Sequence, residues 1–173
     1  MKNLQKLFSM TMLVCMAVAM FSCSKDEEEL GVEAGIVGKW EISSIENLVN
    51  GQSPDRFVTQ MAQQLGISVE EFEEEYGDFD GFDEEVSGIF QFNEDQTYVE
   101  IINDNKGEGT WSAGVDRTLE VKYENAAGYE TYVYDVKTLK SDRASLSLSG
   151  TDKERIGDSE MDINFEFIVH LKR

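Results

Sequence analysis

From Gly35 onward, apolar and polar residues alternate with a period of two along most of the chain. This spacing is typical of antiparallel strands with one buried face. The clearest stretch is the last, where Met161, Phe165, Phe167 and the other odd-numbered residues would face one way and mostly polar neighbours the other. Eight strands are predicted in all, at residues 37–46, 88–92, 97–102, 109–112, 119–123, 132–136, 144–149 and 161–171.

The strand order predicts a mainly all-β fold, an eight-stranded antiparallel up-and-down β-barrel over residues 35–173. Short turn-forming clusters such as residues 93–96 (Asn-Glu-Asp-Gln) join consecutive strands, so the sheet would be a meander. A sheet of eight strands can close on itself, which removes exposed edges and leaves an interior wide enough for side chains or one small ligand.

A helical, acidic insertion is predicted at residues 50–87, between the first and second strands. Residues 53–55 (Ser-Pro-Asp) have the composition of a helix start, and glycine at position 66 would end this helix. A second short helix would begin at Ser68, where Glu71 completes a capping box, and would end at the glycine at position 77.

The two predicted helices carry an apolar stripe formed by Phe57, Met61, Leu65 and Phe72. A stripe of this kind must lie against another apolar surface. We expect it to rest on the open end of the barrel as a lid.

Residues 1–22 have the features of a signal peptide, with Lys2 and Lys6 ahead of an apolar run at residues 7–21. That run is short for a membrane span, and an acidic segment follows it. Cys23, preceded by a small serine, ends the run and resembles the lipobox of bacterial lipoproteins. The resemblance implies a lipid anchor on the Cys23 thiol and cleavage before it. The alternative is a cysteine that merely follows a signal peptide.

Residues 23–34 would form an acidic, solvated tether between the lipidated cysteine and the barrel. The run of residues 24–29 (Ser-Lys-Asp-Glu-Glu-Glu) resembles the sorting signal of surface-exposed Bacteroidota lipoproteins. The resemblance implies an outer-membrane lipoprotein. Surface-facing and periplasmic orientations both stay open, because a charged run is usually a linker.

The charge balance excludes several functions. The chain has 35 acidic against 15 basic residues and a net charge of −20, which disfavours nucleic-acid binding and binding to anionic lipid through charge. It has one histidine and two cysteines, and no nucleophile elbow, phosphate loop or paired-histidine motif. We therefore expect a protein that is not an enzyme and uses no cofactor.

Three short motifs resemble the lipocalin-like domains of Bacteroidota lipoproteins. They are residues 37–40 (Val-Gly-Lys-Trp), the hairpin at residues 90–98, and residues 109–112 (Gly-Thr-Trp-Ser). The resemblance implies an eight-stranded lipocalin-like barrel that binds a small apolar molecule. It also implies structural roles for Gly38 and Trp40, with Trp40 packed across the closed end.

Two groups of residues are candidate sites. Aromatic residues on the expected inner face would line a ligand cavity, or alternatively fill the core: Tyr98, Trp111, Tyr123, Tyr132, Tyr134, Phe165 and Phe167. Asp78, Asp80 and Asp83 are weak calcium candidates, because their spacing does not fit a calcium loop and a solvated acidic face explains them better. No metal site is expected.

The sequence leaves two main function hypotheses open. In the first, the anchored barrel binds a small hydrophobic or amphipathic ligand. In the second, the barrel is solid and its acidic surface binds a basic protein partner. A structural lipoprotein without any ligand is the third and simplest possibility.

Overall fold

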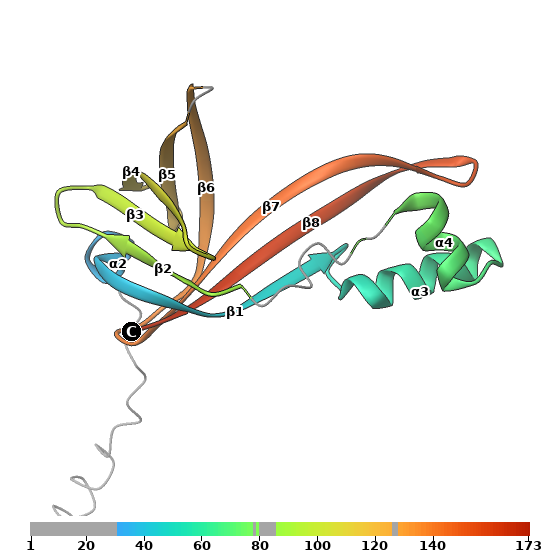
Figure 1. The fold of residues 1–173 in the computed structure, drawn as a ribbon, viewed down its shortest axis with the longest axis horizontal. Coiled ribbons are helices and arrows are strands. Elements are labelled where there is room, and N and C mark those ends of the chain that lie inside the picture. The colour runs from blue at the N-terminus through green and yellow to red at the C-terminus, as the bar shows by residue number, and fades with distance from the viewer. Residues whose placement is uncertain (1–30, 78, 80–85, 126–127) are drawn as a thin grey trace, which may run out of the picture.

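The computed structural model describes residues 31–77, 79, 86–125 and 128–173, and contains a closed barrel of eight antiparallel strands. Each strand pairs with the next along the chain, and β8 pairs with β1 to complete the barrel (Figure 1). The strand bounds are β1 Gly38–Val49, β2 Gly88–Phe92, β3 Thr97–Ile102, β4 Asn105–Ala113, β5 Thr118–Asn125, β6 Gly128–Leu139, β7 Arg143–Ile156 and β8 Ser159–Lys172. The predicted up-and-down barrel of eight strands is confirmed.

The observed strand boundaries agree best with the predicted ones where side-chain hydrogen bonds fix the turn. β2 and β3 have the predicted limits, because the turn between them is fixed by Asp95, whose carboxylate accepts hydrogen bonds from the backbone N–H of Thr97 at 3.0 Å and from its hydroxyl at 2.6 Å. The other six strands are longer than predicted, most of all β7 and β6.

β7 and β8 pair along their whole length, from Arg143 opposite Lys172 to Ile156 opposite Ser159. Their inner halves belong to the barrel, where β6 borders β7 and β1 borders β8. β6 pairs with β7 only as far as Ser147, and β1 with β8 only as far as Phe165. The outer halves therefore project from the barrel as a two-stranded ribbon, which extends far beyond the other strands (Figure 1).

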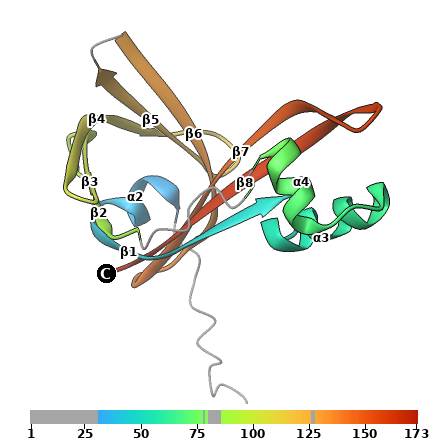
Figure 2. The same ribbon diagram turned by 45° about the vertical axis from the view of Figure 1, so that its right-hand side comes forward.

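Helices α3 (Pro54–Leu65) and α4 (Val69–Tyr76) pack against this ribbon, and not against the open end of the barrel (Figure 2). Phe57, Met61 and Phe72 are buried in a second hydrophobic core with Ile156 and Ile163 of the ribbon. The expectation that the helical stripe forms a lid was wrong, because the ribbon offers an apolar face of its own. Leu65, the fourth expected lid residue, is 37% exposed.

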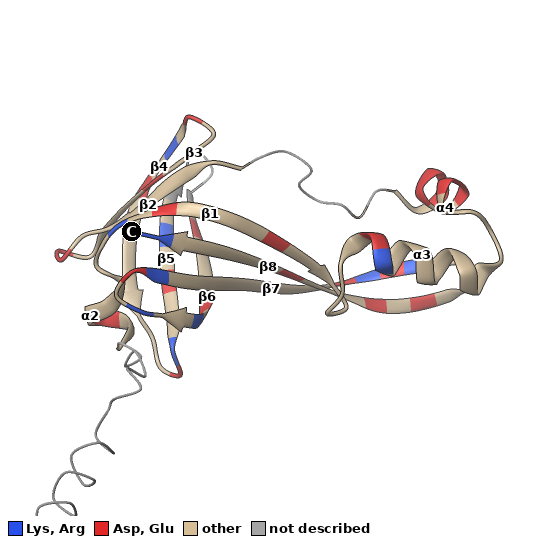
Figure 3. Ribbon diagram, turned by 90° about the horizontal axis from the view of Figure 1, so that it is seen from below, with Lys and Arg blue, Asp and Glu red and all other residues tan. Residues whose placement is uncertain are grey.

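The helix ends follow the sequence signals. Pro54 is the first residue of α3, and Gly66 ends it in the left-handed conformation (φ 72°). In α4 the capping box is complete: the backbone N–H of Glu71 donates to the Ser68 hydroxyl at 3.2 Å, and the Ser68 N–H donates to the Glu71 carboxylate at 2.9 Å. All residues of α4 other than Val69, Phe72 and Tyr76 are glutamates (Figure 3).

The main core fills one end of the barrel, which is closed by a short helix, α2 (Val32–Ile36). Trp40 is fully buried there, and its indole N–H donates to the carbonyl of Ile36 at 2.7 Å. The Arg173 guanidinium lies 4.2 Å from the centre of the Trp40 ring and donates to the carbonyls of Gly35 and Val37 at 2.9 and 2.7 Å. The packed core thus includes Val32, within the segment expected to be a tether.

Gly38 lies beside this closed end with a φ of 129°, a conformation that favours glycine. A Cβ atom at this position would lie 3.5 Å from the Arg173 guanidinium. The structure thus places Gly38 and Trp40 together at the closed end.

Some sequence predictions fall outside the described residues. Cys23 and the signal peptide precede residue 31, and Asp78, Asp80 and Asp83 lie in the gaps around residue 79. Of the helices in the described part of the chain, none is both long and apolar enough to span a membrane.

Candidate functional site

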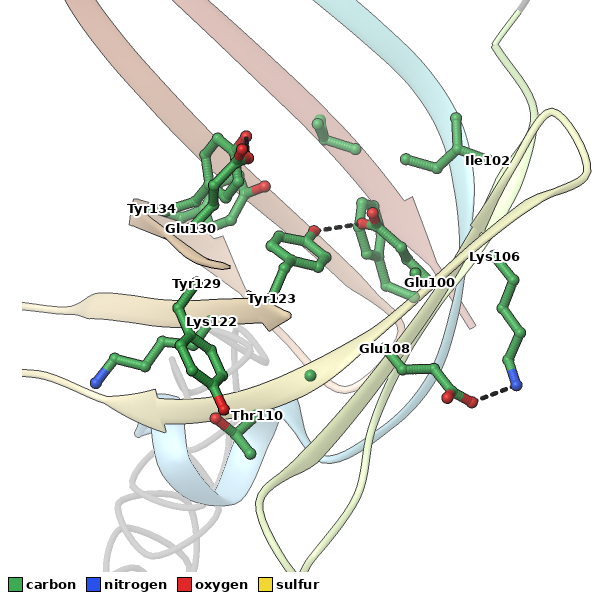
Figure 4. A pocket seen from close by; sticks show the side chains of 15 residues that line it. Glu100, Ile102, Lys106, Glu108, Thr110, Lys122, Tyr123, Tyr129, Glu130 and Tyr134 are labelled. Carbon is green, nitrogen blue, oxygen red and sulfur yellow. Dashed lines mark hydrogen bonds and ion pairs between the residues drawn. The ribbon is translucent and has the colours of Figure 1, made fainter. Parts of the chain in front are cut away.

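The barrel has a cavity of about 1190 Å³ away from the end closed by α2 (Figure 4). Strands β2 to β6 and β8 all contribute to its wall. The lining residues are Phe90, Glu100, Ile102, Lys106, Gly107, Glu108, Gly109, Thr110, Lys122, Tyr123, Tyr129, Glu130, Tyr132, Tyr134 and Val169. This end of the barrel thus has an open hollow, in contrast to the packed core at the other end.

Two glycines on β4 allow Glu100 and strand β5 to lie close to this strand. Gly107, Gly109 and Trp111 follow one another on the same face of this strand, so the first two positions give the wall no side chain. A Cβ atom at Gly107 would come within 2.9 Å of the Glu100 carboxylate, and one at Gly109 within 1.9 Å of the Lys122 carbonyl oxygen. Larger residues would therefore displace Glu100 or a neighbouring strand.

Tyrosines form most of the aromatic wall. The Tyr98 and Tyr123 rings meet edge to face with their centres 5.6 Å apart, and the Tyr123 and Tyr132 rings do the same at 5.4 Å. Such edge-to-face pairs are a favourable aromatic geometry. Tyr134 lies next to Tyr132 along the inner face of β6. The wall therefore combines apolar ring surface with several hydroxyl groups.

A carboxylate, Glu100, lies at the centre of this wall. Its position on β3 between Tyr98 and Ile102 directs it to the inner face. The hydroxyls of Tyr98 and Tyr123 both donate to Glu100 Oε2, at 2.7 and 2.6 Å, and Figure 4 shows Tyr123 and Glu100 pointing toward one another. These two bonds fix the carboxylate in one orientation.

The tyrosine hydroxyls stay protonated over a wide pH range. Burial raises the pKa of Tyr98 and of Tyr123 far above the ordinary value, and the nearby Glu100 carboxylate acts in the same direction. Burial followed by the charge of Glu100 raises the pKa of Tyr134 to about 12. A hydrogen bond to Glu130 raises the pKa of Tyr132. At neutral pH these four residues are therefore uncharged donors.

The two lysines that border the cavity, Lys106 and Lys122, lie on the opposite strand face from their neighbours Gly107 and Tyr123. Lys106 forms an ion pair with Glu108, and Lys122 pairs with Glu120 at 2.8 Å. In Figure 4 the side chains of Lys106 and Glu108 meet on the side of β4 away from Tyr123. Side chains alternate between the two faces of a strand, so Glu100 and Glu130 are the charged lining residues that face the inside of the barrel.

The structure brings together part of the expected wall. Tyr123, Tyr132 and Tyr134 line the cavity. Tyr98 and Trp111 are buried in the main core, 1% and 4% exposed, and Trp111 donates its indole N–H to the Asn93 carbonyl at 2.9 Å.

The two expected wall residues on β8 have other positions. Phe165 packs against the second core, which the helices share with the ribbon. Phe167 lies on the same face of β8 as Val169, between the two cores along the strand, and is outside the lining set.

Sequence reasoning missed Glu100, Glu130, Phe90, Ile102 and Val169. Their strand positions were available as a signal, because Glu100 alternates with Tyr98, and Glu130 with Tyr132. The glycines at positions 107 and 109, spaced by two ahead of Trp111, were a second signal, because glycine within a strand often marks the close approach of another group.

A second group of polar residues lies on the outside of the barrel. The Ser145 hydroxyl is 2.9 Å from His170 Nδ1, and His170 Nε2 is 3.6 Å from the Glu46 carboxylate. The order serine, histidine, carboxylate is that of a hydrolase triad, but the side chains of His170 and Glu46 are 36% and 53% exposed on an outer sheet face. Groups in contact with solvent lack the water-excluded setting of such a site, so this row gives no support for catalysis.

No cluster of three or more potential metal ligands occurs among the residues that the structure describes. Comparison with protein families, curated proteins and solved structures finds no match for this chain. The geometry of the cavity is therefore the main guide to function.

Proposed function

We propose that this protein is a non-enzymatic, lipid-anchored outer-membrane lipoprotein whose lipocalin-like barrel binds a small hydrophobic or amphipathic molecule. The observation that supports binding is the cavity of about 1190 Å³ among Phe90, Ile102, Val169 and the tyrosines. Ligand pockets usually measure about 300–1000 Å³ and combine apolar walls with a few polar groups. The cavity is somewhat larger than this range and combines apolar walls with polar groups, and its volume argues against a solid barrel.

The ligand would enter at the open end of the barrel, away from α2, and not beneath the helices. α3 and α4 are bound to the ribbon through the second core, and the Tyr76 hydroxyl accepts a hydrogen bond from the Gly157 N–H at the ribbon tip, at 3.0 Å. These contacts hold the helical hairpin at the ribbon. The helical insertion is accordingly a separate structural unit in this proposal.

A neutral, apolar fluorescent probe tests the proposal. N-phenyl-1-naphthylamine should bind to the purified protein with a saturable rise in emission. Ile102→Trp, which adds a large side chain at the cavity wall, should weaken this binding by about tenfold, the equivalent of about 1.4 kcal/mol. Val133→Trp is the matched control, since Val133 is 49% exposed and outside the lining set. Equal binding by both variants, or no binding by the unmodified protein, would contradict the proposal.

The anchor has a separate test. Bacteria that express the full chain should incorporate an alkyne-labelled fatty acid into it, and Cys23→Ala should abolish the label. Retention of the label in this variant would place the lipid elsewhere or refute the lipobox assignment.

A further inference from the structure

We propose that the barrel cavity selects amphiphiles with a cationic ammonium headgroup, which it would hold between the Glu100 carboxylate and the surrounding tyrosine rings. This inference rests on the proposed ligand-binding function and names the chemical class of the ligand. The features that carry it are the charge of the inner face, the spare acceptor capacity of Glu100 and the aromatic surface beside it.

The inner face of the cavity is negative. Its charged side chains are Glu100 and Glu130, while Lys106 and Lys122 pair with carboxylates on the other face. The whole chain adds a net charge of −20, which raises the local concentration of cations and lowers that of anions. A ligand with a carboxylate or phosphate would have to approach against this charge.

Glu100 is held in place and still has acceptor capacity. Both tyrosine hydrogen bonds reach Oε2, and among the described residues none reaches Oε1. An ionised carboxylate has about four acceptor positions over its two oxygens. An ammonium group could therefore bind Oε1 without breaking either tyrosine bond.

The tyrosines supply the second part of the site. Tyr123 lies within hydrogen-bond distance of Glu100 and meets Tyr132 edge to face, so ring surface extends from Glu100 along the wall. The faces of tyrosine rings attract cations, and this attraction increases as the cation loses water. The apolar residues Phe90, Ile102 and Val169 border the same space and would contact an alkyl tail.

The test compares four ligands that share a ten-carbon chain and differ at the headgroup: decylammonium, decyltrimethylammonium, decanoate and decanol. Binding to the purified protein is measured by calorimetry below the micelle concentration of each ligand. At least one of the two cations should bind about tenfold or more tightly than both decanoate and decanol. Decylammonium can donate hydrogen bonds to Glu100, whereas decyltrimethylammonium has no N–H group and can be held only by charge and by the ring faces. Comparison of the two therefore shows which interaction dominates.

Glu100→Gln should weaken the preferred cation by about 10- to 100-fold, the range for a hydrogen bond to a charged group, and leave decanol binding unchanged. Glu94→Gln is the control of equal charge, because Glu94 is exposed in the turn between β2 and β3. If Glu100→Gln does not fold, the selectivity of the unmodified protein decides alone.

Each outcome has one meaning. Similar affinities for all four ligands, or tighter binding of decanoate, would overturn the cation preference and leave the proposed binding function intact. A cation preference that survives Glu100→Gln would overturn the role of this carboxylate. No binding of any ligand would overturn the proposed function itself.

Discussion

Phe72→Ala should unfold the helical insertion and the ribbon tip while the barrel stays folded. Phe72 is fully buried in the second core, with its ring centre 4.9 Å from that of Tyr76 and 6.0 Å from that of Phe79. Truncation of a buried phenylalanine to alanine costs about 3–5 kcal/mol. Among the described residues, eight are buried in the second core, so we expect a loss of this size to detach α3 and α4 from the ribbon.

The chain has built-in reporters for this experiment. Trp40 and Trp111 are its only tryptophans, and both belong to the main core, so tryptophan fluorescence follows the barrel. Far-ultraviolet circular dichroism near 222 nm follows the helices, most of whose described residues belong to α3 and α4. In Phe72→Ala the helical signal should be lost at a lower urea concentration than the fluorescence signal, and amide exchange should accelerate in the outer halves of β7 and β8.

Phe92→Ala is the matched control. Phe92 is 1% exposed and packs against Tyr98 and Trp111 in the main core. This variant should lose both signals together, because β1, β7 and β8 must be in place for the ribbon and helices to pack. If the two signals also coincide in Phe72→Ala, the two cores form one cooperative unit and the reasoning fails.

Three further results are expected. Arg173→Ala, and to a smaller extent Arg173→Lys, should lower stability by about 1–3 kcal/mol in urea unfolding, since both lose hydrogen bonds to backbone carbonyls at the closed end. Ser68→Ala should reduce stability of the insertion by about 1 kcal/mol in the same helical signal, whereas Ser53→Ala should change little, because the Ser53 side chain makes no capping hydrogen bond. The free energy of unfolding should fall as pH rises above about 10, because the pKa values of Tyr98 and Tyr134 are raised in the folded state and the unfolded chain loses these protons first. Each residue should lower this free energy by about 1.4 kcal/mol per pH unit until the pH reaches its folded pKa, which is about 12 for Tyr134. A stability that is constant or rises from pH 10 to pH 12 would contradict the last of these.

The local parts of the fold could be predicted because neighbouring residues determine them. The β2–β3 turn depends on residues 93–97, and the start of α4 depends on Ser68 and Glu71. In both cases the hydrogen-bonding partners are within four residues of one another, so the sequence contains the complete interaction. The same holds for the glycine that ends α3.

The length of the ribbon could not be predicted, because alternation reveals a strand only where one face is buried. Residues 150–156 read Gly-Thr-Asp-Lys-Glu-Arg-Ile, and only Ile156 among them is buried. The strand continues through this segment because β8 supplies hydrogen-bonding partners as far as Ser159. The apolar stripe of α3 and α4 was evident in the sequence. The sequence did not specify which apolar surface would cover this stripe.

Glu100 was missed although it shares the inner face of β3 with Tyr98, because charged side chains are seldom expected on the buried face of a strand. A barrel that required only a filled core would gain from an apolar residue at position 100, since burial of a carboxylate is costly even when it is hydrogen-bonded. The chain instead keeps a carboxylate there, two tyrosine hydroxyls to hold it, and Gly107 beside it where a Cβ would crowd its Oε1 atom. Residues that do not favour core packing tend to mark functional positions. At this end of the barrel the Glu100 carboxylate itself, the two tyrosine hydroxyls that bind it and Gly107 beside it are three such features at one place.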